Sequence, residues 1–584
     1  MRSLNKPTRS RLAALLAVSC CALATNGVGR AEPAPASGIP TAPTPNATIN
    51  LIRLMVEQKL LPAEAAEKLI AQAEAEANQA RAALAQASTS APSAAAPAPS
   101  APGTVRVTYI PPHIRRQMVE EVRQEVMSEA VNERWADPRA LPEWATRWKF
   151  AGDIRLRYEA VSFPEGNATG LDALNISAIN AGRGVQLNGA ATQDEPLPYL
   201  NADQDRQRVR ARARLGADIN LQEGFTTSVR FATGESSSPV SQNQTLGAGN
   251  GNFSKYSLWL DRAVLNYDTE LADTSVTASV GRMANPFFAT SMIWSNDLGV
   301  DGLVLKGTRR MGDFTPFATV GLLPVYNTAF DLSTNSATKA DSYDKWLYAV
   351  QLGTDWKITR DFEAKFAAAY YHFDNIEGQT SSPTDGTVLD SGDTDASRLL
   401  FAQKGNTYRL IRDLNAPVGT TKQYNYFGLA SPYREVALTG RIDYNHFDPV
   451  QISFLAEVVK NIALDEGSVA ASPYTFNNLA GGGSFDGGDL GFYTAIQVGH
   501  PLLAQRWDWN VSLGYRQVET DAVVDGFADS DFGGGGTNVK GFTLGGNLSL
   551  SERVWVGARL MSSDNVSGPT LKNDTFQFDI NGRF

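Results

Sequence analysis

One stretch, DRQRVRARARLGADINL, places arginine at every second position from Arg206 to Arg214. The positions between these arginines are Gln207, Val209, Ala211 and Ala213. Alternation with a period of two is typical of a β-strand, whose side chains point to two opposite faces. Burying such a face in lipid would cost about 2–4 kcal/mol per arginine near the midplane. The arginine face must therefore meet water.

The same alternation recurs along the chain, with aromatic residues near the ends of many segments. WKFAGDIRLRYEA and RWDWNVSLGYRQ are further examples. We count sixteen segments, which begin near residues 148, 206, 225, 255, 274, 300, 314, 345, 363, 434, 450, 490, 507, 538, 553 and 575. Long gaps follow the odd-numbered segments and short turns such as ITRD follow the even-numbered ones. Long outer loops and tight inner turns are typical of outer-membrane barrels.

These observations predict an all-β transmembrane antiparallel β-barrel of about sixteen strands over residues 147–584, preceded by short periplasmic α-helices. No run of about 18 apolar residues is present for a membrane helix, so a membrane protein with this sequence must be a closed barrel. A soluble sandwich or solenoid is the alternative. Such a fold would bury its apolar face inside and would not gather aromatic residues at the strand ends.

The first 146 residues divide into five segments by composition. Residues 1–24 have a basic head and a short apolar run, which predict a signal peptide with cleavage there or as late as residue 31. Both cysteines, Cys20 and Cys21, lie inside it, and a lipoprotein signal is the weaker alternative. We expect a disordered Pro/Ala-rich segment at 25–46, periplasmic helices at 47–87, a linker at 88–103 and a periplasmic segment with a helix at 104–146.

The arginine face is expected to line the lumen of the barrel. The predicted basic lining consists of Arg155, Arg157, Arg206, Arg208, Arg210, Arg212, Arg214, Arg230, Arg262 and Arg282. Two interpretations remain open. The arginines either pair with lumenal acids such as Asp153, Glu159 and Asp218, or face an acidic loop across a constriction that biases ion passage.

Residues 281–303, GRMANPFFATSMIWSNDLGVDGL, are the candidate for such an inward-folded loop. The stretch is too apolar for a surface loop and carries Asp297 and Asp301, which we expect to be the acidic side of the constriction.

The sequence carries no convincing signal of enzymatic chemistry. His113, His372, His446 and His500 show no metal-ligand spacing, and no nucleophile elbow or phosphate loop occurs. We therefore expect no catalytic site, no metal, no cofactor and no nucleic-acid partner. The glycine-rich FGGGGTN, in the predicted outer loop 522–537, is expected to be a flexible loop.

Several segments, taken in order, resemble the bacterial "putative porin" family. They include VTYIPPHIRRQMVEEVRQEV, LPEWATRWKFAGDIRLRYE, the 281–303 stretch, QKGNTYRL, FGLASPYREV and VVKNIALD. The resemblance implies an outer-membrane barrel with a periplasmic helical extension. The closing stretch with Phe576, Phe578, Ile580 and Phe584 also resembles the C-terminal signal read by the barrel assembly machinery.

The expected function is an outer-membrane channel for passive diffusion of small hydrophilic solutes or ions. The alternative is a barrel that anchors periplasmic helices, residues 47–87 and 113–132, which bind peptidoglycan or a partner protein. The other expected partners are outer-membrane lipid and the barrel assembly machinery. A homotrimer is a further expectation, since the small Ala211 and Ala213 on the outer face would suit a protein interface.

Overall fold

The computed structural model describes residues 143–584, apart from 187–196, 237, 250, 329–341, 388–389, 391 and 416–421. Four of the predicted segments lie wholly outside the described residues: 1–24, 25–46, 47–87 and 88–103. The fifth, 104–146, lies outside them up to residue 142. None of the helices in the described ranges is both long and apolar enough to cross a membrane.

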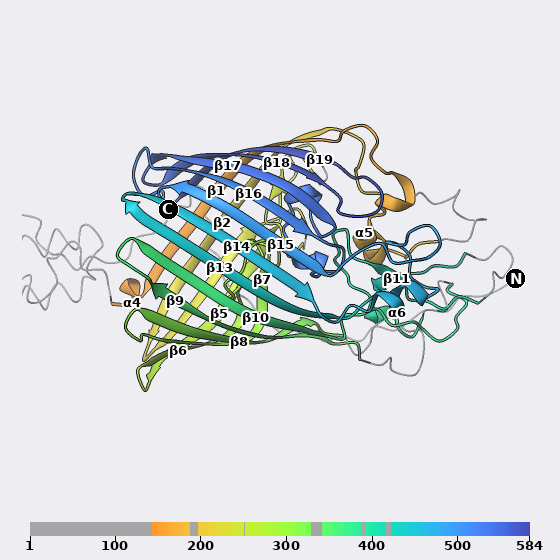
Figure 1. Ribbon diagram of the computed structural model, residues 1–584, viewed down its shortest axis with the longest axis horizontal. Helices are drawn as coiled ribbons and strands as arrows, with labels where there is room; N and C mark the ends of the chain where they lie inside the picture. Colours follow the sequence, from red (N-terminus) through yellow and green to blue (C-terminus); the bar gives the residue numbers. More distant parts are fainter. Residues whose placement is uncertain are drawn as a thin grey trace, which may run out of the picture. The chain divides into compact units, whose positions relative to one another are not determined.

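Sixteen antiparallel strands form one closed barrel (Figure 1). They are β1 (Trp148–Ser162), β2 (Arg206–Gln222), β3 (Phe225–Thr233), β5 (Leu258–Leu271), β6 (Thr274–Ala284), β7 (Gly299–Arg309), β8 (Phe314–Tyr326), β9 (Lys345–Lys357), β10 (Phe362–Asp374), β13 (Tyr433–Phe447), β14 (Val450–Asn461), β15 (Leu490–Gly499), β16 (Trp509–Val518), β17 (Val539–Ser551), β18 (Val554–Asp564) and β19 (Asn573–Arg583). The predicted fold and strand number are confirmed, and every predicted start lies within three residues of the observed one.

The remaining elements lie in or beside the long loops. The short strand β4 (Gln244–Thr245) pairs with β2, and β11 (Tyr408–Leu410) pairs with β12 (Phe427–Leu429). The helices α5 (Ile176–Ala181) and α6 (Glu466–Ala471) lie at the long-loop end of the barrel, while α4 (Glu143–Thr146) precedes β1 (Figure 1).

The last strand closes the barrel against the first. In the β1–β19 ladder Leu156 is opposite Ile580, and Gly152 and Phe584 exchange two backbone hydrogen bonds of 3.0 Å. The ring of Phe584 lies against Gly152, where an added Cβ would approach within 2.5 Å of it. Closure leaves neither strand with an unpaired edge, as a membrane requires.

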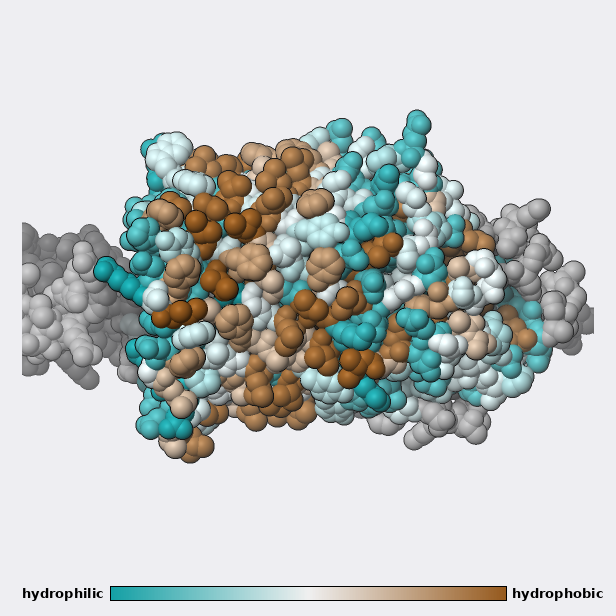
Figure 2. All heavy atoms as spheres, in the orientation of Figure 1, coloured by the Kyte–Doolittle hydropathy of each residue, from teal (hydrophilic) through white to brown (hydrophobic). Residues whose placement is uncertain are grey.

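The outer face of the barrel is apolar and the inner face is polar. Phe150, Leu352 and Leu438 are exposed by 59–71 % on the outside. Figure 2 shows hydrophobic side chains scattered across the barrel wall, with hydrophilic residues at the rim that carries the short turns. Gln351 and Gln577 on the inner face are only 1 % exposed, because inward-folded loops cover them.

The glycine-rich FGGGGTN is not a flexible loop, and that prediction is wrong. Gly533 to Gly536 all have positive φ, between 63° and 95°. An added Cβ on Gly536 would lie 2.1 Å from the carbonyl oxygen of Lys404. The glycines are needed because the backbone of the loop at Lys404 packs closely against them.

Candidate functional site

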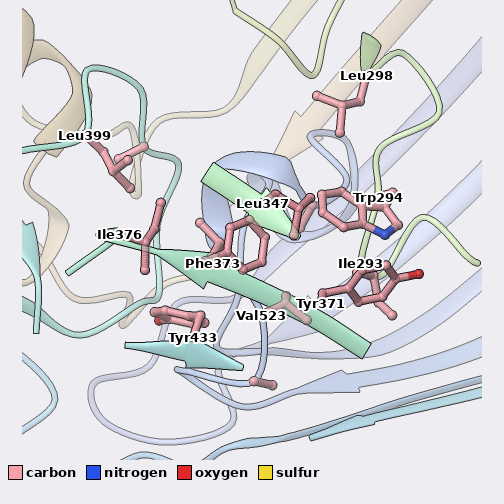
Figure 3. Packing of buried hydrophobic residues seen from close by; sticks show 14 of the residues in the cluster. Ile293, Trp294, Leu298, Leu347, Tyr371, Phe373, Ile376, Leu399, Tyr433 and Val523 are labelled. Atoms are coloured by element: carbon pink, nitrogen blue, oxygen red, sulfur yellow. The ribbon is translucent and has the colours of Figure 1, made fainter. Parts of the chain in front are cut away.

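The loop between β6 and β7, residues 285–298, folds into the barrel. Met292 and Ile293 are 1 % exposed and Trp294 is 4 % exposed. The Trp294 ring packs edge-on against Tyr371 of β10 at 5.2 Å, and Phe373 lies beside it (Figure 3). Phe527 also packs against the Trp294 ring. The apolar residues that looked out of place for a surface loop are therefore a packing surface inside the barrel. We call residues 285–298 the inward loop.

Polar tethers fix the inward loop to the far wall of the barrel. Glu457 of β14 accepts a hydrogen bond from the Thr290 backbone nitrogen at 2.9 Å and another from the Thr290 hydroxyl. Gln351 of β9 binds both the nitrogen and the oxygen of Phe288, at 2.8 and 2.9 Å. The inward loop therefore crosses the lumen from β6 and β7 to β9 and β14.

A second segment, residues 519–538 between β16 and β17, also lies inside the barrel. Its Asp531 pairs with Arg157 of β1 and with Arg559 of β18, each at 2.7 Å. Burial disfavours ionisation of Asp531, but the nearby guanidiniums outweigh it and hold the pKa of this carboxyl well below its usual range. Backbone hydrogen bonds join the segment to the inward loop, from Ser295 to Phe527 and from Asp529 to Ser291.

The arginines of β2 lie on the inner face and are paired with carboxylates. Arg208 and Arg210 both contact Glu159 of β1, at 2.5 and 3.4 Å. Arg214 contacts Asp153 at 2.6 Å. Arg212 contacts Asp153 at 2.9 Å and also Asp297 of the inward loop at 3.2 Å. Most of the ladder thus pairs with carboxylates of the wall, and Arg212 pairs with both the wall and the inward loop.

The arginines of β2, together with charged residues of neighbouring strands and loops, form what we call the arginine cluster. Arg157 also binds Asp579 of β19 through two hydrogen bonds of 2.7 and 2.9 Å. The cluster consists of Arg155, Arg157, Arg208, Arg210, Arg212, Arg214 and Arg559, with the carboxylates Asp153, Glu159, Asp297, Asp531 and Asp579.

Three further arginines of the predicted lining lie outside the cluster. Arg230 pairs with Asp261 at 2.5 Å, and Arg262 is directly opposite Arg230 in the β3–β5 ladder. Arg206 is exposed at the start of β2, at the long-loop end.

Arg282 and Asp301 do not lie where the sequence predicted. They face each other across the β6–β7 ladder at 2.8 Å, two residues from the exposed pair Val280 and Leu303. By strand alternation Arg282 and Asp301 share the outward side of Val280 and Leu303, and both also border the cavity that Trp294 and Asp297 of the inward loop line. Asp301 belongs to β7 and not to the inward loop, which ends at Leu298. An ion pair is tolerated there because the outer face is close to water near the strand ends.

Two cavities meet at Asp297. The larger, of about 460 Å³, has an apolar side formed by Trp259, Leu347 and Phe373. The smaller, of about 290 Å³, is lined by polar groups of the arginine cluster, including Arg155. Asp297 borders both, so its ion pair with Arg212 lies between them.

The predicted C-terminal signal residues all lie on the outer face. Phe576, Phe578, Ile580 and Phe584 are exposed by 37, 38, 45 and 57 %.

Sequence reasoning did not identify Arg559, Asp531 or Glu457. Alternation in the last strand predicts Asp579 on the inner face, where it pairs with Arg157. Asp531 follows no strand pattern, and only the fold of residues 519–538 brings it to the wall.

A closed barrel with an apolar exterior and a polar lumen narrowed by an inward loop defines a bacterial outer-membrane channel of the porin class. The model of the family described as "Putative porin" matches residues 45–584, and the chain belongs to this family. It is an outer-membrane porin, a channel for small solutes.

The chain is similar to solved porin structures at low sequence identity. OprB of Pseudomonas putida, solved at high pH, is 12 % identical with a TM-score of 0.38, covering 77 % of this chain and 97 % of its own. The anion-selective porin from Comamonas acidovorans is 12 % identical with a TM-score of 0.35, and the match covers 75 % of this chain and 99 % of the porin. OmpF of Salmonella typhi, in complex with daunomycin, is 10 % identical with a TM-score of 0.36, and the match covers 75 % of this chain and 97 % of OmpF. No curated protein matches the sequence.

Proposed function

We propose that this porin selects small hydrophilic solutes by charge, at a constriction between the arginine cluster and the inward loop. The observation that carries the proposal is the ion pair between Arg212 and Asp297 at 3.2 Å. It links the basic wall to the loop at the point where the two cavities meet. In a narrow, water-filled passage such opposed charges act on every ion that passes.

The sign of the selectivity follows from the charge balance of the cluster. In the described part of the chain the cluster has seven arginines and five carboxylates, a surplus of two positive charges. Anions should therefore pass more readily than cations.

The test is a planar-bilayer measurement on purified, refolded protein in a KCl gradient. We expect discrete conductance steps and a reversal potential that indicates preference for chloride. Steps without chloride preference would contradict the charge mechanism while leaving the channel intact.

A second function is favoured by how tightly the lumen is filled. Lys345 and Asn461 on the inner face are completely buried, and Glu457 is 1 % exposed. A barrel this full would suit an anchor for the N-terminal segments, which we place in the periplasm. If the refolded protein gives no conductance steps, the anchor becomes the better proposal, and removing residues 32–103 should abolish binding to peptidoglycan or a partner.

We further propose that the barrel forms a homotrimer and is assembled by the barrel assembly machinery. The small side chains Ala211 and Ala213 lie on the outer face of β2 and would allow close contact between barrels. Cross-linking in outer membranes tests the trimer, and a monomer throughout would refute it.

A further inference from the structure

Arg155 differs from the other arginines around the polar cavity. It lies in the middle of β1 and is directly opposite Arg212 in the β1–β2 ladder. Its guanidinium donates a hydrogen bond to the side-chain oxygen of Asn243, and its Nε is buried without a partner. Among the described residues, no carboxylate lies within ion-pair distance of Arg155. Arg155 therefore has no ion-pair partner of its own among the described residues.

The carboxylates nearby are already engaged by other arginines. Four aspartates line the cavity. Asp579 is held by Arg157 through two hydrogen bonds, and Asp297 is held by Arg212. Asp531 pairs with Arg157 and Arg559, and Asp529 pairs with Arg516. A buried charge without a partner is costly, and the cost rises when a like charge lies beside it. Such a group is stabilised when a ligand brings the missing negative charge.

The cavity beside Arg155 has room for a small ligand. Its far wall is formed by Gly545 of β17 and Gly557 of β18, which project no side chain into it. Asn547 and Gln577 add neutral amides to the lining. The volume of about 290 Å³ is at the lower end for ligand pockets, which span roughly 300–1,000 Å³.

We propose that Arg155 and this cavity form a binding site for a small oxyanion, a carboxylate or a phosphate. The planar guanidinium presents paired donors that match two oxygens of either group. The site rests on the proposed function in one respect, since bound anion is expected to lie on the conducting path. The site itself can be measured without conduction.

The first test is the unfolding temperature of detergent-solubilised protein in sodium acetate, sodium phosphate or sodium chloride at equal ionic strength. A ligand that binds only the folded state raises this temperature. We expect acetate or phosphate to raise it above the chloride value in the wild type, and Arg155→Gln to lose at least tenfold in apparent affinity. A rise with phosphate alone would assign a tetrahedral dianion, and a rise with acetate alone a carboxylate.

Two variants separate binding from folding. Arg155→Gln removes a charge that has no ion-pair partner of its own among the described residues, so it should fold and be no less stable than the wild type without oxyanion. Gly545→Met should fill the cavity while leaving Arg155 in place, and should also abolish the oxyanion effect. Arg309→Gln, at the short-turn end of β7, is the control that should leave the effect unchanged.

The second test is current block in planar bilayers, with acetate or phosphate added to KCl. We expect concentration-dependent block in the wild type and at least tenfold weaker block in Arg155→Gln. Equal unfolding temperatures in all three salts, with normal conductance, would overturn the oxyanion site but not the channel. A clear oxyanion effect in detergent without any conductance would refute the channel proposal and leave the site standing.

Discussion

Neutralising Arg208, Arg210 and Arg212 together should change the charge selectivity of the pore toward cations. The arginine cluster has a surplus of two positive charges, so removing three leaves a surplus of one negative charge. The carboxylates of Glu159 and Asp297 would also lose the guanidiniums that neutralise them. Replacement by glutamine keeps a polar side chain of similar reach.

The expected size of the change follows from Coulomb's law. A unit charge about 8 Å from a monovalent ion contributes about 0.5 kcal/mol in water. Three charges contribute about 1.5 kcal/mol, which salt at 0.1 M reduces to about 0.7 kcal/mol. Potassium and chloride respond with opposite signs, so their permeability ratio should change by about 1.4 kcal/mol, or about tenfold.

Reversal potentials in a KCl gradient measure this ratio directly. The matched control removes the same charge at the short-turn end, with Arg309→Gln, Lys357→Gln and Arg553→Gln in one protein. We expect the control to resemble the wild type. Unchanged reversal potentials in the ladder variant would refute the reasoning, since the arginines would then lie off the ion path.

Three further predictions concern the loops and the closing strand. Glu457→Ala leaves the two Thr290 donors without a partner, which costs about 1–3 kcal/mol for each donor. Single-channel records should therefore become noisier while the barrel still folds. Quiet records would contradict the tether. Burial raises the pKa of Asp525 to about 7, above its ordinary value, so packing of residues 519–538 should be strongest at acidic pH and weaken as pH rises through 7. Hydrogen exchange corrected for intrinsic rates should show this, and Asp525→Asn should reduce the dependence, the remainder being due to the buried Asp521 and Glu435. Deleting Phe584 should lower the folded yield in the outer membrane far more than the conductance of inserted channels, whereas equal yield would count against its role in assembly.

The sequence predicted the wall of the barrel well because each wall strand obeys a local rule. A strand between lipid and water must alternate, so Val209 and Arg210 could be assigned to opposite faces from their neighbours alone. The inward loop was also predictable, since Phe287 and Trp294 are too apolar for a loop in water.

The interior was less predictable because its contacts join distant parts of the chain. The pairing of Arg157 with Asp531 spans 374 residues, and no local pattern indicates it. Arg282 was assigned to the lumen from its charge, but the register with β7 places it outside with Asp301. The glycines of FGGGGTN looked flexible because the sequence does not show the segment at Lys404 that packs against them.

The tether between Thr290 and Glu457 has a consequence for the order of assembly. The two residues are 167 positions apart, and the second lies on β14. The inward loop cannot dock until β14 has joined the sheet, so the narrow part of the pore must form after most of the wall. Until then Met292, Ile293 and Trp294 lack their final packing partners. A substitution in β14 that removes the tether should therefore leave a barrel that inserts normally but never narrows its pore.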